Sequence, residues 1–241
     1  MIMENIRIYC ENDKDYKKVA PGTRLSELAD QFPHEERFLA ALVDNKLKEL
    51  DYRLMQPHNI RFIGYDHPDG RRTYIRSLCF VLQNAVSELY PDKVLAVDYS
   101  LPSGLYCEIR EINPMEDGRP DVYFATDAEL EAIKEKMNET IAADMPFKKV
   151  KMTFDEASKL FSAKHQKEKV HLLNTLERFT YNVYFLDGKA DTFYGPLAPS
   201  TGYLKTFDIM GFNNGFCLQY PMDGDSGKVL PMKRQSKLAT A

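Results

Sequence analysis

The segment at 195–205 reads GPLAPSTGYLK and is the most informative stretch of the 241-residue chain. Phe193 stands two residues before its Gly-Pro pair, and Leu197 directly follows that pair. A second stretch, RSLCF, places Arg76 and Phe80 four residues apart, which is the spacing that brings two side chains to one face of a helix. Phenyl and isobutyl groups neither bind a metal nor move a proton, and a guanidinium has no free lone pair. These four side chains therefore predict neither a hydrolytic centre nor a metal site.

Both stretches resemble parts of the editing domain of threonyl-tRNA synthetase, a domain that alanyl-tRNA synthetase shares. In that family a Cys stands where this chain has Phe193, and a His stands where it has Leu197. A His-x-x-x-His pair aligns with Arg76 and Phe80. The resemblance covers about 71–222 and implies an α+β domain whose polar centre has been replaced. Such a replacement favours binding or regulation over hydrolysis.

The first 65 residues predict a small β-rich unit. Apolar and polar residues alternate along Ile6–Cys10, which is typical of a strand with one buried face. Two short stretches, VAPGT at Val19–Thr23 and VDNK at Val43–Lys46, contain turn residues, and Thr23 is predicted to cap a helix. Their order resembles a TGS domain, a β-grasp module. The resemblance implies an N-terminal TGS domain over 1–65.

In the second region, apolar residues three and four apart predict a central helix at about 72–89, after a turn-rich linker at 66–70. Asp127 is predicted to cap a second helix. Residues 204–210 read as a strand, and 223–241 as a linker or tail. The apolar stripe of the central helix is Tyr74, Leu78, Leu82, Ala85 and Leu89.

Composition sets the broad class of the protein. Hydrophobic residues make up 44% and charged residues 28%, as in a globular protein, and the net charge of -4 gives no overall basic field. No apolar run reaches the length of a membrane span, and no signal peptide is evident. The four cysteines form no CxxC pair, so we expect free thiols in a reducing cytoplasm. The segment GDSGK at 224–228 lacks the spacing of a P-loop and predicts a turn.

The resemblance gathers six residues around one cleft, which we expect to bind an anionic nucleotide or an RNA end. The two cations would contact phosphate, and the aromatic rings would stack on a base. The alternative is a core filled by apolar side chains, with the arginine in a structural salt bridge and the lysine on the surface. The six predicted ligand residues are Arg76, Phe80, Phe193, Leu197, Tyr203 and Lys205.

Three functions fit these observations. The first is a non-catalytic regulatory region that precedes a uridine-kinase-like domain, because the domain order resembles bacterial nucleoside-kinase fusions. In that case ATP and Mg would belong to the downstream kinase, and the present segment would need no cofactor. The second is a tRNA-binding or trans-editing module related to Ser-tRNA deacylases, with its active-site residues replaced. The third is an active deacylase whose catalytic residues have moved.

Overall fold

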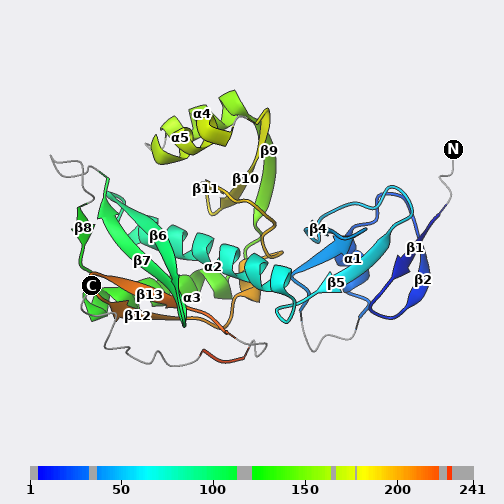
Figure 1. Ribbon diagram of the computed structural model, residues 1–241, viewed down its shortest axis with the longest axis horizontal. Helices are drawn as coiled ribbons and strands as arrows, with labels where there is room; N and C mark the ends of the chain where they lie inside the picture. The colour runs from blue at the N-terminus through cyan, green and yellow to red at the C-terminus, as the bar shows by residue number, and fades with distance from the viewer. Residues whose placement is uncertain are drawn as a thin grey trace.

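The chain is described by a computed structural model, whose helices and sheets confirm the predicted α+β class (Figure 1). Of the predicted tail at 223–241, only 227–229 fall within the described part of the chain. Among the described residues, no helix combines the length and hydropathy that a bilayer span requires. The structure describes residues 5–32, 37–112, 121–163, 167–176, 178–222 and 227–229.

The N-terminal part forms a five-stranded sheet, in the order β2-β1-β5-β3-β4, with one short helix packed on it. The alternation predicted for β1 is confirmed, because Ile8 and Cys10 are buried against Leu25 and Leu28 of the helix. Its membership of the TGS family stays a prediction. The elements are β1 (Ile6–Cys10), β2 (Asp15–Val19), α1 (Leu25–Ala29), β3 (Ala40–Val43), β4 (Lys46–Lys48) and β5 (Asn59–Ile63).

The predicted helix cap is wrong in this unit. The backbone N–H of Arg24, the N-cap residue, donates to the Glu27 carboxylate at 3.2 Å. The hydroxyl of Thr23 instead donates to the carbonyl of Ala20 at 2.8 Å, so the preceding turn uses it.

The second part packs two helices on one antiparallel sheet through apolar side chains. α2 and α3 cover one face of a sheet with the order β12-β13-β7-β6, and β8 pairs with β7 (Figure 1). The α2 stripe is buried as predicted from Tyr74 to Ala85, but Leu89 is 39% exposed because the helix ends there. The elements are α2 (Pro68–Leu89), β6 (Lys93–Leu101), β7 (Gly104–Glu111), β8 (Val122–Tyr123), α3 (Asp127–Ala142), β12 (Asp208–Phe212) and β13 (Gly215–Gln219).

A third, smaller sheet has the order β11-β10-β9 and carries a helical hairpin. Phe161 and Leu173 of the hairpin pack with Val183 of the sheet in a cluster separate from the main core. The elements are β9 (Lys148–Thr153), α4 (Phe154–Ala163), α5 (Lys167–Leu176), β10 (Thr180–Leu186) and β11 (Lys189–Thr192).

Three boundaries in the second part differ from the sequence predictions. α2 begins at Pro68 rather than 72, because the His67 side chain accepts a hydrogen bond from the Asp69 N–H. Thr126 rather than Asp127 caps α3, in a reciprocal arrangement with the carboxylate of Glu129. The predicted strand at 204–210 is wrong over its first half. Residues 204–207 form no strand, and they link the 3-10 helix η1 (Thr201–Tyr203) to β12.

The four cysteines are free, as the sequence predicts. Burial raises the pKa of each thiol, to about 12 for Cys79. The thiols therefore stay protonated at neutral pH, which makes them poor nucleophiles.

The start of α2 provides a test of how the two parts join. A Cβ atom at Gly70 would lie 1.8 Å from the carbonyl oxygen of Gly64, so the first turn of α2 lies directly on the chain leaving β5. We expect Gly70→Ala to lower the free energy of unfolding by at least about 2 kcal/mol, despite the better helix propensity of Ala.

The matched control is Gly211→Ala in β12. A Cβ atom there would meet its nearest neighbours at 3.6 Å, which is ordinary contact. Urea unfolding followed by circular dichroism compares the two. Equal midpoints for both variants would contradict the close approach of α2 to Gly64.

Candidate functional site

Arg76 ties α2 to the segment that links β11 to β12. Its Nε and Nη2 atoms donate to the Pro196 carbonyl at 3.1 and 3.0 Å, and Nη2 also donates to the Thr73 hydroxyl at 3.1 Å. The guanidinium lies against Gly195, where a Cβ atom would come within 2.8 Å of its Cζ. Burial lowers the pKa of this half-buried guanidinium. Its charge thus has a structural use, although through a carbonyl rather than the salt bridge of the sequence alternative.

Apolar side chains fill the space one turn further along α2. Phe80 has no exposed surface, and its ring centroid lies 5.9 Å from that of Phe147 and 5.3 Å from that of Phe193. The ring of Tyr184 meets Phe193 edge-on at 5.9 Å. Leu197 is only 2% exposed. In this structure Phe80 and Leu197 therefore offer no surface to a ligand.

Polar groups that the sequence analysis missed fix the same segment. The Ser77 hydroxyl accepts a hydrogen bond from the Ala198 N–H at 2.8 Å and donates to the Thr73 carbonyl. Thr201 is fully buried, and its hydroxyl donates to the Thr140 carbonyl at 2.7 Å. The signal was present in the sequence, because Thr73 and Ser77 lie four apart on the buried face of α2.

The last two predicted ligand residues lie further along. Tyr203 belongs to η1 and is half-buried, with the Arg37 guanidinium 5.0 Å from its ring centroid. Lys205 is exposed and makes no ion pair with any residue that the structure describes. The six residues therefore comprise a packed group of four, a half-buried tyrosine and a free lysine. Their role in ligand binding stays a prediction.

The N-terminal part reaches this packed group through one acidic side chain. The Tyr184 hydroxyl donates to Glu49, and the Lys149 ammonium forms an ion pair with the same carboxylate. The Tyr184 oxygen also lies 3.3 Å from the Gly195 carbonyl oxygen. Burial, followed by the charge of Glu49, raises the pKa of the Tyr184 hydroxyl, which therefore stays protonated at neutral pH.

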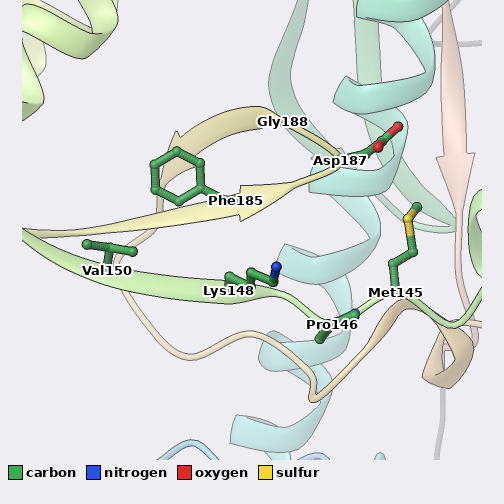
Figure 2. Close-up of a pocket in the computed structure, with 7 residues that line it drawn as sticks. All are labelled: Met145, Pro146, Lys148, Val150, Phe185, Asp187 and Gly188. Atoms are coloured by element: carbon green, nitrogen blue, oxygen red, sulfur yellow. The ribbon is translucent and has the colours of Figure 1, made fainter.

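A pocket of about 560 Å³ lies beside this group (Figure 2). Figure 2 shows the Phe185 ring on β10 and the Lys148 ammonium on the adjacent β9. Met145 lies just before β9, and Asp187 lies just after β10. None of the six predicted residues lines it, but Phe147, which stacks on Phe80, directly follows one of its lining residues. The lining residues are Met145, Pro146, Lys148, Val150, Phe185, Asp187 and Gly188.

No protein-family profile matches the chain. A threonine–tRNA ligase of Desulforamulus reducens is 29% identical over 207 residues, which make up 85% of this chain and 31% of that protein. A threonine–tRNA ligase of Acetivibrio thermocellus is 29% identical over 173 residues, 71% of this chain and 26% of that protein. Threonine–tRNA ligase 2 of Bacillus subtilis is 25% identical over 200 residues, 82% of this chain and 30% of that protein.

The chain thus spans about a third of the length of the curated relatives it matches. A threonyl-tRNA-synthetase-like α+β region is supported over most of the chain.

The packing of Phe80 predicts a stability effect that a ligand-stacking residue in an open cleft would not show. Phe80→Ala should cost about 3–5 kcal/mol of unfolding free energy, because it leaves a cavity among Phe147, Phe193 and Leu197. The control is Phe179→Ala, since that ring is 94% exposed and its loss should change little. Urea midpoints measure both. A Phe80 variant as stable as the control would show that the cluster is open in solution.

Proposed function

We propose that this chain binds the acceptor end of a tRNA and does not hydrolyse it. The observation that carries the proposal is the packed group of Arg76, Phe80, Phe193 and Leu197, at the positions where the resemblance expects metal ligands and catalytic groups. The tRNA part of the proposal is supported by the similarity to threonine–tRNA ligases, which covers 85% of the chain in the comparison with the Desulforamulus reducens protein.

The exposed parts of the six residues define how an RNA end would be held. Phe80 and Leu197 are buried and support the site from behind. Phe193 and Tyr203 are half-buried and can each present one ring edge or face to a base. Lys205 is exposed and supplies the mobile cation for a phosphate.

Hydrolysis of an aminoacyl ester needs a group that activates water. Phenyl and isobutyl side chains cannot accept a proton, and the Arg76 guanidinium donates to Pro196. The neighbouring Tyr184 hydroxyl is held protonated by its raised pKa. Among the described residues no three His, Cys, Asp or Glu side chains gather as a metal site, and the lack of a metal itself stays a prediction.

The proposal is tested with tRNA-Thr, uncharged and mischarged with serine. We expect binding that weakens with salt, and serine release no faster than in buffer. Lys205→Gln should weaken binding and reduce the slope of log K against log salt by about 0.7–0.9, the value for one lost phosphate contact. Lys151→Gln is the matched control, because Lys151 is also exposed and also lacks an ion pair with described residues.

Two results would contradict the proposal. Faster serine release in the presence of the protein would establish the active deacylase of the third hypothesis. Equal effects of the Lys205 and Lys151 variants would remove Lys205 from the binding site. A mononucleotide that competes with tRNA would identify the smaller ligand expected from the sequence.

The predicted fusion to a uridine-kinase-like domain, with its ATP and Mg, concerns sequence after Ala241 and stays a prediction. A P-loop motif further along the reading frame is the observation that would support it.

A further inference from the structure

One face of the N-terminal sheet is exposed at its β1–β2 end, whereas Ala40 and Ile63 on the same face are buried. The side chains of Ile6, Ile8 and Cys10 point to the core formed with α1, so the alternate residues of β1 point to the opposite face. β1 and β2 lie at the end of the long axis that is remote from β8 (Figure 1). The residues of the opposite face on β1, β2 and β5 include Arg7, Tyr9, Tyr16, Lys18 and Arg61, which we call the outer-face set.

Two cations of the outer-face set stand directly opposite each other. Arg7 of β1 is the cross-strand partner of Lys18 of β2, and both are exposed. Like charges at opposed positions destabilise a sheet. Arg7, Lys18 and Arg61 make no ion pair with any described residue. The acidic residue Glu11 directly follows β1, and its N–H donates to the carbonyl of Ile60, the neighbour of Arg61. The fold thus keeps an unfavourable pair that a bound anion would relieve.

Two aromatic residues form the next row. Tyr9 and Tyr16 are also cross-strand partners, and their ring centroids are 5.0 Å apart. The Cζ atom of Arg7 lies 3.7 Å from the Tyr16 centroid, so the guanidinium stacks over one face of that ring. The exposed guanidinium is itself a plane on which a base can stack. Tyr16 is 56% exposed. A cationic row and an aromatic row therefore adjoin on an open sheet face.

We propose that the outer-face set binds single-stranded RNA. Bases stack on aromatic rings and on guanidinium planes, while cations beside them contact the phosphates. An acidic peptide would satisfy the cations but would make no use of the exposed aromatic row. This surface is separate from the Arg76 group and does not rest on the function proposed for that group.

The experiment uses the whole chain and a short fluorescein-labelled oligouridine RNA, followed by fluorescence anisotropy over a series of KCl concentrations. The probe has no aminoacyl end, so its result is independent of the deacylation test. We expect Arg7→Gln/Lys18→Gln to weaken binding and to reduce the slope of log K against log salt by about 1.4, since each phosphate contact to a single strand contributes about 0.7. Tyr16→Leu should lower the affinity by about fivefold to a hundredfold and leave the slope unchanged.

The matched control is Lys46→Gln/Lys151→Gln, which removes two exposed lysines that lie outside the outer-face set. The melting temperature gives a second readout. Loss of the opposed like charges should raise it by about 1–3 °C in the Arg7/Lys18 variant. If that variant melts lower instead, Lys18→Gln alone carries the affinity measurement.

Three outcomes would overturn the proposal. The RNA does not bind wild type at low salt. The Arg7/Lys18 variant binds like the control variant. Polyglutamate displaces the RNA as well as unlabelled oligouridine does, which would leave only a nonspecific anion surface. None of these results affects the binding of tRNA near Lys205.

Discussion

The hydrogen bonds from the Arg76 guanidinium to the Pro196 carbonyl hold together the two segments that define the candidate site. A proline carbonyl in a Gly-Pro loop has no neighbouring strand to satisfy it, and a charged donor makes the strongest hydrogen bond available. With Pro196 fixed, Ala198 reaches the Ser77 hydroxyl and Leu197 enters the core. Arg76 thus anchors the loop that carries Pro196.

The apolar side chains at this site determine its energetics as well as its chemistry. Each ring that enters a core contributes about 1.5–3 kcal/mol by leaving water, and offset aromatic pairs add to it. Phe80 stacks on Phe147 and makes a tilted contact with Phe193, and Tyr184 extends the cluster to Glu49 of the N-terminal part. A catalytic site must keep polar groups partly unsatisfied, whereas this one satisfies them. The result is a closely packed group in which Phe80 and Leu197 are buried.

The sequence predicted the buried faces well because burial imposes a period. The alternation at Ile6–Cys10 and the stripe of α2 both appear as expected. The helix ends were predicted less well, because alternative local hydrogen bonds compete for the capping side chains. The Thr23 hydroxyl donates to the turn carbonyl of Ala20 instead of capping α1. The His67 side chain caps α2 about one turn before its predicted start. The Glu49 contact could not be predicted, since it joins residues 135 positions apart and follows no local pattern. The family resemblance located the Arg76 group, but the packing that closes it is visible only in the structure.

The exposed residues of β1 and β2 indicate where charge is concentrated on the surface. A net charge of -4 excludes an overall basic field, yet electrostatic attraction at about 8 Å screening length depends on the nearest charges rather than on the total. Arg7 and Lys18 lie within one strand spacing of each other, so together they raise the potential above that part of the sheet. An acidic remainder lowers the nonspecific attraction of a polyanion to the rest of the surface. Local charge on the exposed side of a strand therefore predicts an interaction surface that whole-chain composition hides.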